Sequence, residues 1–201
     1  MSFLDFLSWL GLMTFAATGA LMAVEKRFDL VGVVVLAGVT AIGGGSIRDM
    51  VVGSLPPQAF RNEGQLWGVL VVALLVARFY RRVGGLERHI YYLDTLGLGL
   101  FSALGAERGI MFGLGLWGTV FAGAVSGVGG GVLRDLLAGD VPGILYRNRD
   151  LYASAAAAGA LVVFLLHGGL NDYALLAGAL VTIGLRLSSR WLGLRMPAPK
   201  G

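Results

Sequence analysis

The sequence contains no cysteine and few charged residues, since Asp, Glu, Lys and Arg together make up 14% of its 201 residues. The absence of cysteine excludes disulfide bonds, thiolate metal sites and cysteine nucleophiles. With 56% hydrophobic residues and a mean hydropathy of +0.77, the chain is too apolar for a soluble domain of this size to cover with polar surface. It is therefore predicted to be an integral membrane protein.

Enzyme motifs are lacking as well. The glycine runs are not followed by the Gly-Lys-Ser/Thr of a phosphate-binding loop, and no Ser-His-Asp or His-Glu cluster occurs. The two histidines, His89 and His167, fall in predicted joints, so no metal site is expected. The 33 glycines have no three-residue period, which excludes collagen and leaves close helix packing or helix breaks. We expect neither enzyme activity nor a cofactor.

Seven apolar runs are each near the roughly 20 residues that cross a hydrocarbon core. They cover residues 5–24, 30–55, 66–83, 90–106, 110–138, 151–167 and 171–189. The first run has no basic segment before it and no convincing cleavage site, so it reads as a retained span and not as a signal peptide. The predicted fold is one all-α membrane domain, 1–201, with seven transmembrane helices.

An internal repeat relates the two halves of the chain. A shift of 86 residues aligns 11–62 with 97–148 without a gap, and 19 of these 52 positions are identical. The repeats extend over about 5–83 and 90–167, and the helix at about 171–189 is left over. Three spans per repeat is an odd number, so the second repeat should enter the membrane from the opposite side, with a pseudo-two-fold axis in the membrane plane.

The basic residues predict the orientation. With the N-terminus outside, the cytoplasmic joints and tail would hold Lys26, Arg27, Arg78, Arg81, Arg82, Arg88, Arg147, Arg149, Arg186, Arg190, Arg195 and Lys200. The outer joints would hold only Arg61 and Arg108. This asymmetry predicts an inner-membrane protein with its N-terminus outside and its C-terminus in the cytoplasm. The net charge of +4 is then a topology signal and implies no nucleic-acid partner.

One motif occurs in both repeats, as Gly-Gly-Gly-x-x-Arg-Asp at 43–49 and again at 129–135. Three successive glycines are costly inside a helix, so they predict a kink or break in the second and fifth spans. Backbone groups freed at such a break must face protein or water. Paired breaks in two inverted halves indicate an ion or solute pathway. The predicted pore or kink residues are Gly43, Gly44, Gly45, Gly129, Gly130 and Gly131.

The charges of the motif need partners, because an arginine within the membrane costs roughly 2.5–3.5 kcal/mol. We expect crossed ion pairs, Arg48 with Asp135 and Arg134 with Asp49, while pairing within each copy remains an alternative. The pairs could hold the two halves together or line the pathway, and the two roles are compatible. Asp94 and Glu107, which bracket the fourth span, are expected at the interface.

Polar residues in the core spans are candidates for lining a hydrated path. They are Thr14, Thr18, Thr40, Ser46, Ser102 and Ser126. Serine and threonine also bond back to carbonyls of their own helix, and this is the commoner arrangement.

The doubled motif, the downstream Gly-x-x-Pro and Arg-Asn, and the seventh span together resemble the prokaryotic trimeric intracellular cation (TRIC) channels. The resemblance covers nearly the whole chain. It implies a homotrimer in the lipid bilayer with one pore in each protomer, kinked second and fifth helices along that pore, and conduction of monovalent cations, K⁺ foremost. The matching positions are Gly43, Gly44, Gly45, Arg48, Asp49, Gly129, Gly130, Gly131, Arg134 and Asp135.

The chain is also similar to bacterial membrane proteins with a glycine-transporter type of domain, so a carrier of a small solute such as glycine is the alternative to a channel. An assembly scaffold without transport is a third reading, although a scaffold has no use for paired breaks. In animal channels of the family a lysine-containing motif replaces one glycine motif. This sequence lacks it, so functions of that lysine are not transferred.

Overall fold

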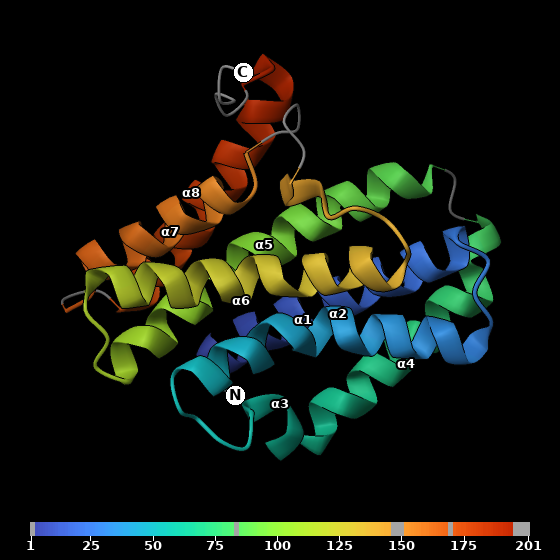
Figure 1. The fold of residues 1–201 in the computed structure, drawn as a ribbon, viewed down its shortest axis with the longest axis horizontal. Helices are drawn as coiled ribbons and strands as arrows, with labels where there is room; N and C mark the ends of the chain where they lie inside the picture. Colours follow the sequence, from blue (N-terminus) through green and yellow to red (C-terminus); the bar gives the residue numbers. More distant parts are fainter. Residues whose placement is uncertain (1–2, 83–84, 146–150, 169–170, 195–201) are drawn as a thin grey trace.

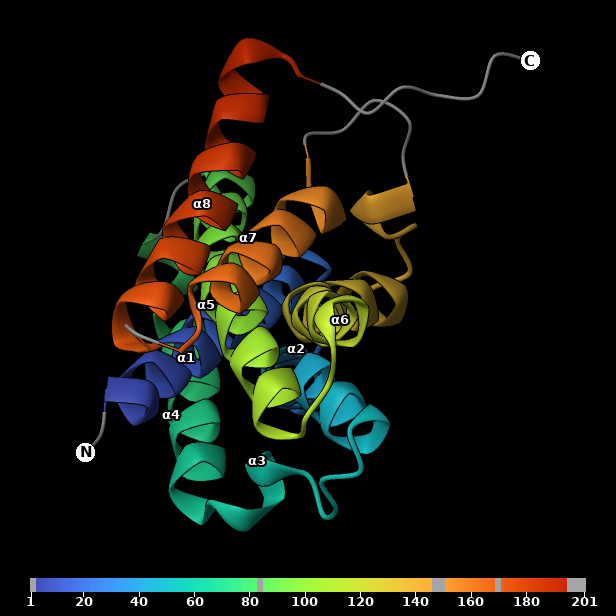
Figure 2. The same ribbon diagram turned by 90° about the vertical axis from the view of Figure 1, so that its left-hand side faces the viewer.

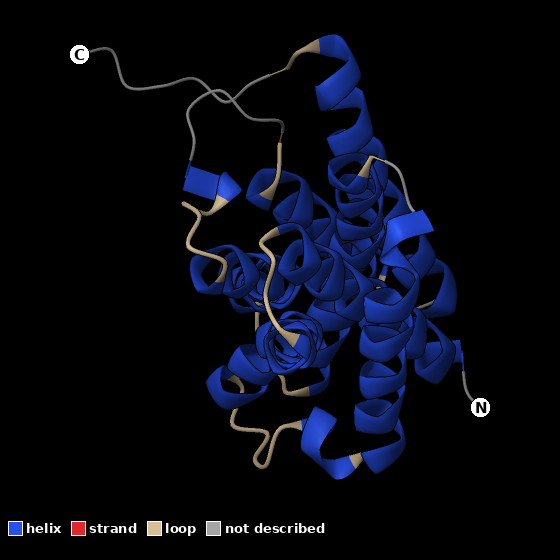
Figure 3. Cartoon of the chain, turned by 90° about the vertical axis from the view of Figure 1, so that its right-hand side faces the viewer, coloured by secondary structure: helices blue, strands red, loops and turns tan. Residues whose placement is uncertain are grey.

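The computed structural model describes residues 3–82, 85–145, 151–168 and 171–194, and the regular secondary structure within these ranges is helical (Figure 3). The α-helices are α1 (Phe3–Glu25), α2 (Leu30–Val51), α3 (Gln58–Arg61), α4 (Glu63–Phe79), α5 (Leu86–Met111), α6 (Leu116–Leu137), α7 (Ala153–Leu166) and α8 (Asn171–Leu192). Two 3₁₀ turns, η1 (Tyr80–Arg82) and η2 (Gly143–Leu145), follow α4 and α6. Each of the seven predicted spans overlaps one of the seven longer helices. The four-residue helix α3 lies in a predicted joint.

Four of these helices are long and apolar enough to cross a membrane: α1, α2, α6 and residues 172–192 of α8. The shorter helix α7 is apolar, whereas α5 carries Asp94, Glu107 and Arg108 along its length. All three of these side chains are largely buried within the protein. These three charged side chains are turned into the protein, whereas Glu87 and Arg88 at the start of α5 are exposed.

Helices α1 and α5 occupy the middle of the bundle (Figure 2). Helix α1 packs against α2, α4 and α5, while α5 packs against α1, α6, α7 and α8. Many of the most exposed side chains are large and apolar, among them Trp117 at 81% and Trp191 at 74% exposure. Such a surface is suited to lipid or to contact with another subunit.

The two repeats pack in the same way. A Cβ atom at Gly19 of α1 would meet Leu36, Ala37 and Thr40 of α2, and one at Gly105 of α5 would meet Ala122, Gly123 and Ser126 of α6. Each of these second-repeat residues is 86 positions after the equivalent residue of the first repeat. The sequence repeat is thus also a repeat of helix packing. Between the halves, α2 and α6 lie side by side and run in opposite directions (Figure 1).

Helices α2 and α6 end in the same way, two residues after the Asp of the motif. Gly53 and Gly139 both have φ +78°, a left-handed conformation that glycine adopts without strain. The next residue in each case, Ser54 or Asp140, donates its backbone N–H to the carbonyl of Asp49 or Asp135. This is a Schellman cap. It places the Arg-Asp pairs in the last helical turn, whereas the predicted span 30–55 placed the first pair well inside the membrane.

Candidate functional site

The glycines of the motif lie where α2 crosses α6. A Cβ atom at Gly44 would come closer than 3.0 Å to the Ser126 carbonyl oxygen and to the backbone nitrogen of Gly130. A Cβ atom at Gly130 would come equally close to the carbonyl oxygen of Thr40. Only glycine allows the two helix backbones to touch at this point.

The expected break in these helices is wrong. Helix α2 is continuous through Gly43, Gly44 and Gly45, and α6 is continuous through 129–131. Each glycine costs about 1 kcal/mol in a helix, but each backbone group left unpaired in lipid costs several kcal/mol, so the intact helix is favoured. The close contact of the two helix backbones explains why these positions are glycines, and no helix break is needed to explain them. A kink without a break stays a prediction, as does a pore-lining role.

The outer glycines of each triplet have their own neighbours. Gly43 faces Leu133 of α6, and Gly129 faces Gly44 of α2. Gly131 leaves room for the Tyr152 hydroxyl, and Gly45 lies near the Arg48 guanidinium. The six predicted glycines therefore fall at one crossing and at the two charged groups beside it.

The first charged group, which we call the first cluster, consists of Arg48, Asp49, Arg108 and Ser126. Arg48 donates from Nε and Nη2 to Asp49 Oδ1 at 3.0 and 2.8 Å. Its Nη1 donates to Ser126 Oγ of α6 at 3.2 Å, and Arg108 Nε of α5 lies 3.9 Å from Asp49 Oδ1. Arg48 is 6% and Asp49 1% exposed. The cluster joins α2 to both α5 and α6.

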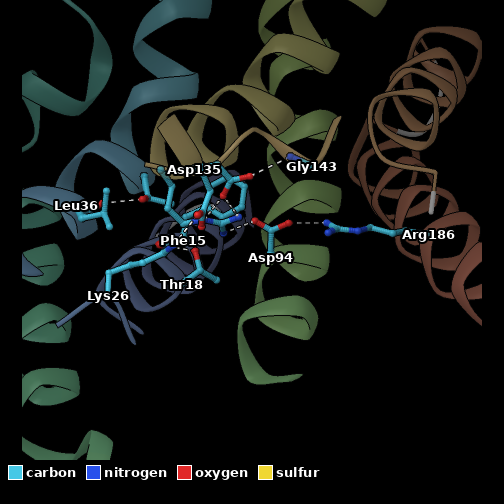
Figure 4. A network of polar contacts seen from close by, with 11 residues as sticks. Phe15, Thr18, Lys26, Leu36, Asp94, Asp135, Gly143 and Arg186 are labelled. Carbon is cyan, nitrogen blue, oxygen red and sulfur yellow. Dashed lines mark hydrogen bonds and ion pairs between the residues drawn. The ribbon is translucent and has the colours of Figure 1, made fainter. Parts of the chain in front are cut away.

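The second cluster consists of Arg134, Asp135, Asp94 and Arg186, and Figure 4 shows Asp94 between the motif and Arg186 of α8. Arg134 donates from Nε and Nη2 to Asp135 Oδ1 at 3.0 and 2.9 Å. Its Nη1 donates to Asp94 Oδ1 at 2.7 Å, and Arg186 Nη1 donates to Asp94 Oδ2 at 2.7 Å. Three helices, α5, α6 and α8, meet at these four charges.

The expected crossed pairing is wrong, and the alternative, pairing within each copy, is observed. Gly44 meets Gly130 at the crossing of two antiparallel helices, and each arginine lies four residues beyond that point along its own helix. The arginines are therefore separated along the helix axes by eight residues, or about 12 Å at 1.5 Å per residue. An aspartate adjacent to its arginine cannot span that gap.

In both repeats the second oxygen of the aspartate holds the segment that follows the helix. Asp49 Oδ2 accepts from the backbone nitrogen of Gln58 at 2.8 Å. Asp135 Oδ2 accepts from the backbone nitrogen of Gly143 at 3.2 Å (Figure 4). Each aspartate thus pairs with its arginine and also anchors the chain after the Schellman cap. These contacts support a structural role for the motif, in which each aspartate stabilises the end of its helix and the segment that follows.

A cavity of about 840 Å³ reaches the second cluster from the end of the bundle where α6 finishes. Its lining includes five acidic and five basic side chains: Glu25, Glu87, Asp94, Asp135, Asp140, Lys26, Arg88, Arg134, Arg186 and Arg190. Across it, Lys26 Nζ pairs with Asp140 Oδ1 at 2.5 Å, which joins the loop after α1 to the loop after α6. A cavity with this lining can hold water and ions of either sign.

The predicted polar residues mostly bond to their own helices. Thr14, Thr18, Thr40 and Ser102 donate to carbonyls three or four residues earlier, the commoner of the two arrangements considered. Ser126 differs, because its hydroxyl accepts from Arg48 of the other repeat. Ser46 has a buried hydroxyl with no hydrogen bond among the described residues.

Sequence reasoning misplaced three charged residues. Asp94 and Glu107 were expected at the interface but are 2% and 7% exposed, and Glu107 lies 3.6 Å from His167 Nδ1. Arg186 was counted only as cytoplasmic positive charge, which stays a prediction, but its side chain is 7% exposed and paired with Asp94. Both Asp94 and Arg186 lie inside predicted spans, and a charge within a span requires a partner. That signal could have found the pair. Four of the basic residues used for orientation, Arg147, Arg149, Arg195 and Lys200, lie outside the described residues.

Comparison with known proteins identifies the family. The sequence profile of the family described as Glycine transporter matches residues 5–81 and 91–168, one segment for each repeat. The UPF0126 membrane protein of Deinococcus radiodurans is 48% identical over 195 residues, which cover 96% of this chain and 91% of that protein. The crystal structure of the TRIC trimeric intracellular cation channel orthologue from Rhodobacter sphaeroides has 36% identity and a TM-score of 0.91, and the match covers 96% of this chain and all of that one.

The chain belongs to this family of TRIC and UPF0126 proteins. A second solved structure, of a prokaryotic TRIC channel in 0.5 M KCl, has 29% identity and a TM-score of 0.89, and covers 96% of this chain and 98% of its own. The UPF0126 inner membrane protein YadS of Escherichia coli is 33% identical over 186 residues, or 90% of this chain and 89% of that protein. The resemblance stated from the motif is confirmed, and the chain is an all-α, multi-pass membrane protein of the TRIC fold.

Proposed function

We propose that the chain forms a channel for monovalent cations, K⁺ foremost, with one pathway in each protomer of a homotrimer. The observation that carries this proposal is the 36% identity and full coverage of a TRIC cation channel orthologue, together with charges buried at both ends of the α2–α6 crossing. Buried ionisable groups inside a membrane bundle mark ion pathways more often than they serve lipid contact. The trimeric state is carried over from the same relative, which is a trimeric intracellular cation channel orthologue.

The pathway that we propose runs beside the glycine crossing of α2 and α6, from the first cluster to the cavity at the second cluster. Within each cluster the aspartates neutralise the motif arginines, so these arginines do not by themselves repel a cation. The glycines bring two helix backbones together without side chains between them. A cation at this level could meet the Ser46 hydroxyl, which has no hydrogen bond among the described residues.

The proposed topology has seven membrane crossings in two inverted repeats plus α8, with the N-terminus outside. It is supported by the antiparallel contact of α2 with α6 and by the basic side chains at one end of the bundle, including Lys26, Arg88 and Arg190. The absence of cysteine from the sequence makes this testable. Arg61→Cys should react with an impermeant maleimide added outside intact cells, and Arg81→Cys only after the cells are opened. The reverse pattern would contradict the orientation.

The decisive experiment is a planar-bilayer recording of the purified chain under gradients of KCl and NaCl, with protein-free liposomes as the control. We expect unitary currents whose reversal potential lies near that of K⁺ and not that of Cl⁻. Saturable, counterflow-competent glycine uptake into proteoliposomes without unitary currents would instead establish a carrier. If the protein shows neither unitary currents nor glycine uptake, an assembly scaffold without transport is the remaining function.

A further inference from the structure

Asp94 is shared by two arginines from different helices. Its Oδ1 accepts from Arg134 of α6 and its Oδ2 from Arg186 of α8, both at 2.7 Å, and the side chain is 2% exposed. Arg134 already has a carboxylate partner in Asp135, at 2.9 Å. Arg134 therefore has two carboxylate partners, Asp135 and Asp94. Because Asp135 already balances the charge of Arg134, the negative charge of Asp94 requires a further positive charge.

The first repeat has no equivalent of this arrangement. The position that corresponds to Asp94, 86 residues earlier, is Ser8. Helix α8 lies outside both repeats, so Arg186 has no counterpart at all. The extra acid and the extra base of the second cluster are thus a departure from the two-fold pattern, and they occur together at the cavity.

Arg186 is held in position from several sides. Its guanidinium carbon lies 4.3 Å from the ring centre of Tyr152 and 5.0 Å from that of Tyr91. The Tyr91 hydroxyl donates to the Arg186 backbone carbonyl at 3.3 Å, which fixes α8 against α5. Two aromatic faces and a carboxylate therefore keep one positive charge at the wall of the cavity.

We propose that Arg186 determines how strongly the pathway favours cations, because it brings the formal charge of the second cluster to zero. Two arginines and two aspartates balance, and loss of Arg186 would leave one net negative charge facing the cavity. This inference rests on the proposed channel function. One unit charge acting through water over about 7 Å changes the local concentration of a monovalent cation about threefold. Ring charges at the mouth of a pore act on conductance in this way.

The test measures unitary conductance and the K⁺/Cl⁻ permeability ratio of single channels at low and high salt. At low salt, Arg186→Gln should raise the K⁺ conductance about threefold and Asp94→Asn should lower it about threefold. The double variant D94N/R186Q should return to the wild-type value, and all differences should shrink at high salt, where charges are screened. The control is Arg78→Gln, an exposed arginine outside the cavity, which should leave both quantities unchanged.

A purely structural Arg186 would change the number of channels and their thermal stability but not the conductance of each open channel. Equal unitary conductance and permeability ratio in wild type and Arg186→Gln would therefore overturn the inference. If Arg186→Gln does not assemble, Asp94→Asn is compared with D94N/R186Q. These two variants differ only in the charge at position 186, and neither leaves Asp94 without its partner. Equal unitary conductance of the two would also overturn the inference. Absence of unitary currents in the wild type would instead reject the proposed function.

Discussion

Phe15 and Phe101 stack face to face, with ring centres 5.2 Å apart and ring planes 9° from parallel. They occupy equivalent positions of the two repeats, since 15 plus 86 is 101. Residues related by a two-fold axis can touch each other only beside that axis. Gly44 and Gly130 are a second pair of equivalent residues in contact. The aromatic stack and the glycine crossing are thus two contacts between equivalent positions, which support the proposed two-fold relation of the repeats.

Truncation of either ring should destabilise the protein to a similar degree. Phe15 is 1% and Phe101 6% exposed, so Phe15→Ala and Phe101→Ala should each cost about 3–5 kcal/mol. Because each ring packs on the other, the double variant should cost less than the sum. Equilibrium unfolding in detergent micelles measures these values. A cost below about 1 kcal/mol for one ring alone would show that the repeats do not share the core equally.

The glycine crossing should not tolerate a methyl group. Gly44→Ala and Gly130→Ala both place a Cβ within 3.0 Å of backbone atoms of the facing helix, which cannot move without separating the helices. We expect each variant to lose at least 2 kcal/mol, the scale of a badly overpacked core. Gly38→Ala is the matched control in α2, since a Cβ there meets nothing within 4 Å, and it should gain up to about 1 kcal/mol. Equal stability of the Gly38 and Gly44 variants would contradict the close crossing.

The local pairing of the motif charges makes a prediction that crossed pairing does not. Loss of one member, as in Asp49→Asn, should cost about 3–5 kcal/mol, because Arg48 is left buried without a carboxylate. In a double-mutant cycle with Arg48→Gln, the coupling of Arg48 to Asp49 should exceed about 1 kcal/mol, while that of Arg48 to Asp135 should lie within about 0.5 kcal/mol of zero. A larger coupling of Arg48 to Asp135 than to Asp49 would support crossed pairing and contradict the local pairs.

The ion pair at the mouth of the cavity should contribute little to stability. Lys26 and Asp140 have side chains that are 33% and 42% exposed, so their attraction is weakened by water. Asp140→Asn should cost less than about 1 kcal/mol, and the difference from wild type should vanish in high salt. Thermal unfolding at two salt concentrations tests this. A loss that persists in high salt would mean that Asp140 supports the loop by something other than its charge.

The sequence alone determined the class of the protein, the number and approximate position of the long helices, and the repeat. These follow from composition and periodicity, which depend on the chain and hardly on its partners. The motif residues were also recognisable, because three glycines and two charges in an apolar run are costly wherever they lie. The family resemblance rested on the same residues and is confirmed.

The partners of those residues were decided only by the tertiary structure. An arginine in an apolar run must be paired, but whether it pairs with its neighbour Asp49 or across the protein depends on where two antiparallel helices cross. The same crossing gave the glycines a packing role, while the cost of unpaired backbone groups in lipid favours intact helices. Asp94 and Arg186 are 92 residues apart in the chain, and only the packing of α8 against α5 brings them within 2.7 Å. The local sequence shows that a buried charge needs a partner, and the packing of distant helices determines which residue that partner is.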